Sequence, residues 1–198
     1  MKKYKIFLAS SSELKSDRDQ FEIFIGRKNI DWHDRGVFLE LIVWENFLDA
    51  VAQTSLQEEY NKEIMKCDIF IMLFFTKVGK YTEEEFETAF GQFKATNKPL
   101  IFTYFKDAQI STGSINRDMV SLLNFKEKLG QLGHYYTIYK NIEELQFKFN
   151  QQLDKLSASD FIALKQNKDI SHPNINIGSG GIHYGTGNII GGDYNVKS

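Results

Sequence analysis

The fold is decided by one continuous apolar run, DIFIMLFF, at Asp68–Phe75. Only the first residue of the run is polar, so apolar and polar side chains do not alternate as they do in a half-buried strand. A strand that is covered on both faces has this composition, and both faces are covered mainly in parallel sheets. The run therefore predicts a buried central strand.

Strand-like and helix-like segments alternate on both sides of this run. The other predicted strands are Tyr4–Ala9, Val37–Trp44, Pro99–Phe105 and His134–Tyr139. Helical spacing of apolar residues is found in Glu13–Lys28, Leu56–Ile64, Glu83–Ala95, Asn116–Leu129 and Ile142–Leu156. Strands separated by helices of this length are joined by crossovers rather than hairpins. The pattern predicts an α/β fold, a flavodoxin-like three-layer sandwich with a five-stranded, mostly parallel sheet and helices on both faces.

The composition of the 198 residues narrows the functional classes. Lys and Arg number 24 against 26 Asp and Glu, and the net charge of -2 argues against nucleic acid as the main ligand. The lone Cys67 forms no intrachain disulfide, which suits a reducing compartment. The first apolar run is too short for a signal peptide, and no run has the length of a membrane span. We expect a cytoplasmic protein with no membrane partner.

Ligands of parallel α/β sheets bind beyond the carboxyl ends of the strands, which directs attention to the first loop. Ser10, Ser11 and Ser12 precede Glu13 there, and their hydroxyls and backbone N–H groups suit phosphate or ribose oxygens. The same residues also form a capping box, with Ser10 as N-cap and Glu13 three positions later. The chain has neither the GxGxxG nor the GxxxxGK[ST] phosphate-binding motif.

A second candidate loop lies after the central strand and leads into YTEEEF, residues 81–86. Three carboxylates fall in the first turn of the following helix. Thr82 and Glu85 again satisfy a capping box, and the helix dipole favours Glu83 and Glu84. Alternatively, one carboxylate faces a ribose, and a helix N-terminus that lowers its pKa would keep it ionised beside an oxocarbenium-like centre.

Residues Lys5 to about Leu156 resemble the bacterial branch of the Toll/interleukin receptor (TIR) superfamily. The resemblance rests on three segments: KIFLASSS, CDIFIMLFFT and YTEEEFETAF. It implies that Glu85 is the catalytic glutamate of an NAD glycohydrolase, with Tyr81 as the aromatic residue beside it. It also implies that Ser10 and Ser11 line the nucleotide–ribose side and that the loop after Trp44 closes the pocket or mediates assembly.

Three successive glutamates blur the register of this motif, so Glu84 is a second candidate for the catalytic residue. Trp44 and Glu45 follow the second strand as further candidate ligand contacts, although a Trp there also fits the rim of a core. Two other functions stay open. One is a TIR-like signalling adaptor without catalysis, and the other is a nucleoside or nucleotide glycosidase or deoxyribosyltransferase that uses a similar Glu. The four histidines have no metal-ligand spacing, so we expect no metal and no bound cofactor other than NAD as substrate.

The last part of the chain differs in composition from the rest. We assign residues 1–156 to the α/β domain, 157–173 to a linker, and 174–198 to a Gly/Asn/Ile-rich segment. Half of the 14 glycines fall in that final segment: Gly178, Gly180, Gly181, Gly185, Gly187, Gly191 and Gly192. A flexible tail accounts for the glycines but not for the isoleucines that accompany them.

Alternating Ile and Asn with few charges is compatible with strands stacked in register as cross-β. The tail resembles the short amyloid-signalling motifs of immune effectors, with INIG similar to the core of the RHIM class. The candidate assembly residues are Ile175, Ile177, Gly178, Asn188, Ile189, Ile190 and Gly191. The resemblance implies a homo-oligomer or filament, or a sensor protein with a like motif, and an effector that cleaves NAD on assembly in antiphage defence.

Overall fold

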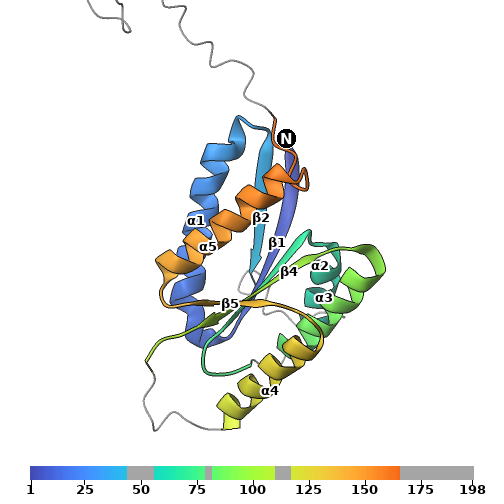
Figure 1. Ribbon diagram of the computed structural model, residues 1–198. Helices are drawn as coiled ribbons and strands as arrows, with labels where there is room; N and C mark the ends of the chain where they lie inside the picture. The colour runs from blue at the N-terminus through green and yellow to red at the C-terminus, as the bar shows by residue number, and fades with distance from the viewer. Residues whose placement is uncertain (44–55, 79–81, 110–116, 166–198) are drawn as a thin grey trace, which may run out of the picture. The chain divides into compact units, whose positions relative to one another are not determined.

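The computed structural model describes residues 1–43, 56–78, 82–109 and 117–165, and Figure 1 shows their arrangement. The strands are β1 (Lys2–Ser10), β2 (Val37–Val43), β3 (Ile69–Phe74), β4 (Leu100–Lys106) and β5 (Tyr136–Tyr139). The helices are η1 (Ser12–Leu14), α1 (Lys15–His33), α2 (Leu56–Lys66), α3 (Thr82–Thr96), α4 (Arg117–Gln131) and α5 (Ile142–Ala158).

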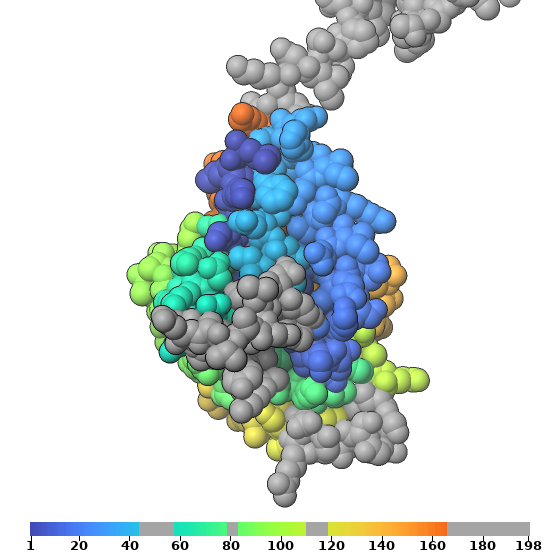
Figure 2. Space-filling model, turned by 180° about the vertical axis from the view of Figure 1, so that it is seen from behind, coloured from blue at the N-terminus to red at the C-terminus, as the bar shows by residue number. Residues whose placement is uncertain are grey.

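The strands form one sheet in the order β2-β1-β3-β4-β5, and each neighbouring pair is parallel. Helices α1 and α5 cover one face, while α2, α3 and α4 cover the other (Figure 1). The view from behind shows α1 and β2 on one side and the start of the α2 and α3 layer on the other (Figure 2). The predicted flavodoxin-like α/β class is confirmed.

Strand β3 has no solvent-facing side, which explains its uninterrupted apolar sequence. Ile69, Ile71 and Leu73 point into the core beneath α1 and α5. The alternate residues, Phe70, Met72 and Phe74, point into the core beneath α2, α3 and α4. Because successive strand side chains face opposite sides, an apolar core on each face requires an apolar residue at every position.

The predicted capping box at the start of α1 is wrong. The chain first makes the short 3-10 turn η1, with Ser11 rather than Ser10 as its N-cap, and no side-chain cap bond forms there. The carboxylate of Glu13 instead contacts the beginning of the β3–α3 loop. Because of this tertiary contact, Glu13 does not form the capping box with Ser10 that the sequence predicted.

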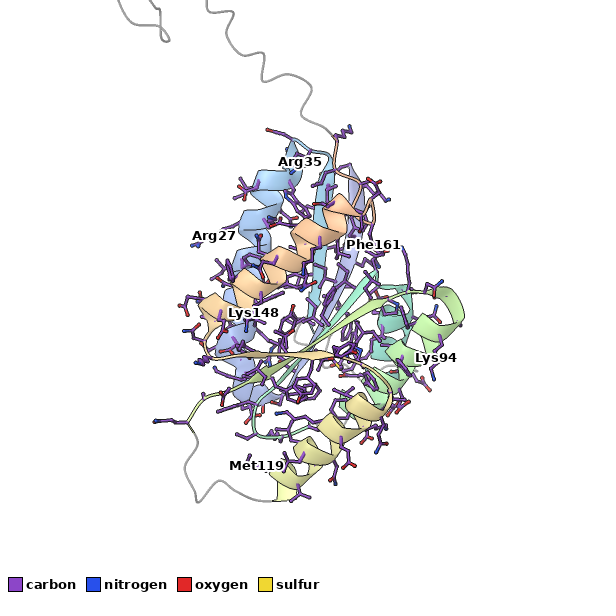
Figure 3. The ribbon with its side chains drawn as sticks, in the orientation of Figure 1. Arg27, Arg35, Lys94, Met119, Lys148 and Phe161 are labelled. Carbon is purple, nitrogen blue, oxygen red and sulfur yellow. The ribbon has the colours of Figure 1, made fainter. Side chains whose placement is uncertain are left out.

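The C-terminal boundary of the α/β domain also differs from the expected position at residue 156. Ile162 is fully buried in the core beneath α1 and α5, and Phe161 and Leu164 pack against it. Ala163 N donates to the Tyr4 hydroxyl at 2.8 Å. Figure 3 shows Phe161 just beyond α5. The packed domain therefore extends through residue 165 and includes nine residues that the sequence analysis gave to the linker.

We expect Ile162→Ala to lower the free energy of unfolding by about 2–4 kcal/mol, because it leaves a cavity in a closed core. Ile30→Ala is the matched control, since Ile30 is 77% exposed on α1. The control change is expected to stay within about 0.5 kcal/mol. Urea unfolding of both variants measures the difference, and equal midpoints would show that residues 159–165 do not contribute to the fold.

Candidate functional site

The sheet topology creates a junction between the carboxyl ends of β1 and β3. From β1 the chain moves outward to β2 and then returns to the other side of β1 to form β3. In open parallel sheets such a reversal separates two loops and leaves a crevice where ligands bind. Ser10 is the last residue of β1, Ser11 follows it, and Thr76 lies just beyond the end of β3.

Glu13 connects these two loops. Its carboxylate accepts hydrogen bonds from Thr76 N at 3.0 Å and from Thr76 Oγ1 at 2.5 Å. Ser11 Oγ donates to the same carboxylate at 2.9 Å. The β1–α1 connection and the start of the β3–α3 loop are thus fixed to each other by one side chain.

A buried ionic cluster lies beside this junction, on the α1 side of the sheet. Asp17 accepts from Lys106 Nζ at 2.9 Å and from the Tyr139 hydroxyl at 2.8 Å. Arg18 Nη1 donates to Ser10 Oγ at 2.6 Å and to Ser11 O at 2.8 Å. Asp17 and Arg18 therefore tie the first turn of α1 to the ends of β1, β4 and β5. Sequence analysis missed this cluster, because its members come together only through the sheet order.

The structure separates the three glutamates of α3 by direction. Glu83 is paired with Lys128 of α4 at 2.8 Å, and Glu84 accepts from Asn61 of α2 at 3.2 Å. Glu85 is 8% exposed and precedes the fully buried Ala89 by one turn, so it lies on the face of α3 that packs toward the sheet. No described residue forms a hydrogen bond or ion pair with its carboxyl group.

Burial, together with the smaller effect of the nearby Glu84 charge, raises the pKa of the Glu85 carboxyl to about 7. The expectation that the helix N-terminus would lower this pKa is wrong. The helix dipole acts favourably, but loss of hydration disfavours the charged form more strongly at a buried site where no described residue is its partner. At neutral pH the group is thus divided between acid and carboxylate.

A buried acid of this kind can exchange a proton in the physiological range or, once ionised, stabilise a nearby cation. It also costs folding free energy, which makes it a candidate functional group rather than a structural one. Glu84 is exposed and already has a partner. The geometry therefore favours Glu85 over Glu84.

Of the predicted substrate contacts, Ser10 and Ser11 lie at the β1–β3 junction, where Arg18 and Glu13 hold their hydroxyls. Trp44, Glu45 and Tyr81 lie outside the described residues, as does the tail. The structure therefore places Glu85 and the two serines at the same edge of the sheet, and the roles of the remaining contacts stay predictions.

Two further features bear on cofactors and reactivity. Within residues 1–43, 56–78, 82–109 and 117–165, no group of three His, Cys, Asp or Glu side chains has a metal-binding arrangement. Cys67 is buried, donates to Ile64 O at 3.1 Å, and has its thiol pKa raised to about 12 by burial. Cys67 is therefore a packed side chain rather than a nucleophile.

No helix in the described part of the chain has the length and apolar character needed to cross a membrane.

Together, the fold and the site define a parallel α/β domain with a buried carboxyl group at the carboxyl edge of its sheet. No protein-family model matches the chain, and no curated protein matches it. Several solved structures do. The CMP N-glycosidase BcmB of Clostridium botulinum has a TM-score of 0.44 at 17% identity, over 74% of this chain and 98% of that one.

Two further matches are similar in extent. The TIR domain heterodimer of RPS4 and RRS1 has a TM-score of 0.48 at 11% identity, over 78% of this chain and 97% of that one. A conserved protein from Enterococcus faecalis V583 has a TM-score of 0.45 at 13% identity, over 76% and 99%. Likenesses of this degree do not indicate what the present chain does.

The titration of Glu85 predicts a pH dependence of stability. Its pKa is higher in the folded chain than the ordinary value of 4.5, so its favourable effect is complete below about 4.5 and is lost as pH rises through about 7. Glu85→Gln removes this loss. We expect the variant to gain up to about 3 kcal/mol relative to the parent between pH 4.5 and 8.

Urea unfolding across that pH range tests the expectation. Glu83→Gln is the control, because Glu83 is an exposed carboxylate in the same turn. If the parent and Glu85→Gln curves run parallel with pH, Glu85 does not titrate near neutrality.

Proposed function

We propose that this protein is an N-glycosidase that hydrolyses the bond between nicotinamide and ribose in NAD, with Glu85 as the catalytic carboxylate. The observation that carries the proposal is the buried carboxyl of Glu85, which has no partner among the described residues. It sits in the first turn of the helix that follows the central strand, within the YTEEEFETAF segment on which the TIR resemblance rests.

The charge of NAD suits such a group. The nicotinamide ring is cationic while it is bonded to ribose and leaves as a neutral molecule, so it needs no proton from an acid. Positive charge then develops on the ribose, where an ionised carboxylate stabilises it, as carboxylates do in glycoside hydrolysis. Water supplies the hydroxyl at the anomeric carbon and releases one proton, which gives nicotinamide and an ADP-ribose product.

Substrate binding also resolves the ionisation of Glu85. A cationic ring near the carboxyl favours its charged form and lowers its pKa in the complex. Ser10 and Ser11 would line the ribose side of the pocket, where Arg18 and Glu13 hold them in place. Trp44, Glu45 and Tyr81 remain the proposed contacts from the adjoining loops.

Purified, assembled protein is expected to consume NAD, and Glu85→Gln is expected to reduce kcat by at least about 100-fold. Because the ionised form is needed, kcat/KM should rise with pH and level off above about 7. Glu84→Gln is the matched control and should retain most of the activity. Equal NAD loss by the parent and Glu85→Gln would remove Glu85 from the mechanism.

The same pKa also favours a second candidate, a nucleoside or nucleotide glycosidase. An ordinary nucleobase leaves poorly without a proton, and a carboxyl with a pKa of about 7 can donate one at neutral pH. In that case kcat/KM on nucleosides should fall as pH rises past 7, opposite to the trend for NAD. Absence of turnover on NAD, NADP and nucleosides by the assembled protein would favour the non-catalytic signalling adaptor.

We further propose that the C-terminal segment drives assembly and thereby activates the enzyme in antiphage defence signalling. Deletion of residues 171–198 is expected to abolish fibre formation and the thioflavin response while the domain stays folded. Sedimentation and electron microscopy of both chains measure the effect. Unchanged assembly by the shortened chain would make the segment a linker.

A further inference from the structure

A cavity distinct from the region of Glu85 lies at the amino half of β4. Its volume is about 200 Å³. The residues that line it come from the end of α3, the start of β4 and the turn before β5: Phe90, Phe93, Leu100, Ile101, Phe102 and His134. A cavity of about 150 Å³ with apolar walls is enough to hold a benzene ring.

The edge of β4 is uncovered at this cavity. Leu100 N donates to Asp68 O at 2.9 Å, so the backbone N–H and C=O of Leu100 face β3. Successive residues of a parallel strand bond to opposite neighbours, which directs the N–H and C=O of Ile101 away from β3. Strand β5 lies on that side of β4 and would form hydrogen bonds with these Ile101 groups if it extended this far. Its pairing with β4 begins only at Thr103, opposite Tyr136.

Ile101 thus presents one donor and one acceptor side by side at a mainly aromatic cavity. The ring of Phe90 stacks on Phe86 with centroids 5.4 Å apart. His134 Nε2 lies 2.9 Å from Thr103 Oγ1, and burial lowers the pKa of the imidazole, so that it is neutral at pH 7. Lys94 Nζ lies 4.4 Å from the Phe90 ring centroid, on the outer side of α3 (Figure 3).

We infer that this cavity is a binding site for a small planar aromatic molecule that bears a primary carboxamide. The ring packs against Phe90 and Phe93, while the amide accepts from Ile101 N–H and donates to Ile101 C=O. An extended peptide fits less well, because only one residue of the edge is uncovered before β5 begins. The site is independent of the proposed catalysis at Glu85.

Three probes of similar size separate the contributions. Benzamide has the ring and the donor–acceptor pair, benzoate has no donor and is charged, and toluene has only the ring. Two net hydrogen bonds predict that benzamide binds at least about tenfold more tightly than either of the others. Titration of the full-length ¹⁵N-labelled protein, followed by amide chemical shifts, should show saturable changes centred on Ile101 and His134.

Variants locate the site. Phe93→Ala is expected to weaken benzamide binding by about tenfold, whereas Phe147→Ala, which removes a 62% exposed ring from α5, should leave it unchanged. Glu85→Gln should leave the benzamide-induced shifts at Ile101 and His134 unchanged, which separates this site from the proposed NAD pocket. Circular dichroism confirms that each variant is folded, and Phe93→Leu replaces the alanine variant if that one is not.

Three results would overturn the inference. The first is the absence of saturable shifts at Ile101 in the parent protein. The second is binding of benzoate or toluene as tight as that of benzamide, which would assign recognition to Lys94 or to the apolar walls alone. The third is loss of the benzamide-induced shifts at Ile101 and His134 in Glu85→Gln.

Discussion

Every strand of this domain runs in the same direction, and the rest of the structure depends on that constraint. Each crossover must carry the chain back over the sheet, so the strands finish at one edge and the helices cover both faces. The core is consequently double, and β3 must be apolar at every position. The polar side chains that follow the strands are brought together at the carboxyl edge whatever their distance in sequence. The Asp17, Lys106 and Tyr139 cluster is a product of this geometry.

Local pattern was enough to predict the elements and the fold class. The run at Asp68–Phe75 and the helical spacing around it are properties of short segments, and such segments form the same element in many contexts. The sheet order and the contact between Glu13 and Thr76 depend on residues that are far apart in the sequence, for which a single sequence has no local pattern. The burial of Ile162 was missed for a related reason. The segment after the last predicted helix is too short to show a periodic pattern that would distinguish a packed segment from a linker.

For Glu85, the candidate catalytic residue, the structure overturns the electrostatic argument made from the sequence, and the catalytic role stays a proposal. The TIR resemblance pointed to Glu85, with Glu84 as a second candidate, and the helix N-terminus suggested an easily ionised carboxylate. The side chain proved to be buried, and desolvation is the larger effect where none of the described residues donates a hydrogen bond to it. Whether a first-turn glutamate is exposed depends on how the helix is rotated about its axis against the sheet. In α3, Glu83 points toward α4 and Glu84 points toward α2, where each has a partner.

The packed segment at residues 159–165 determines where the domain can be attached to a support or a fusion partner without obstructing its candidate site. Lys165 N donates to Arg35 O at 2.9 Å, next to the point where Lys2 N bonds to Gly36 O. These bonds place the last described residue at the amino edge of the sheet, near the labelled N-terminus (Figure 1). A chain that ends at residue 165 therefore has both termini at the edge opposite Glu85. Immobilisation on a solid support, or fusion to a reporter, through either terminus would leave the carboxyl edge accessible to small molecules.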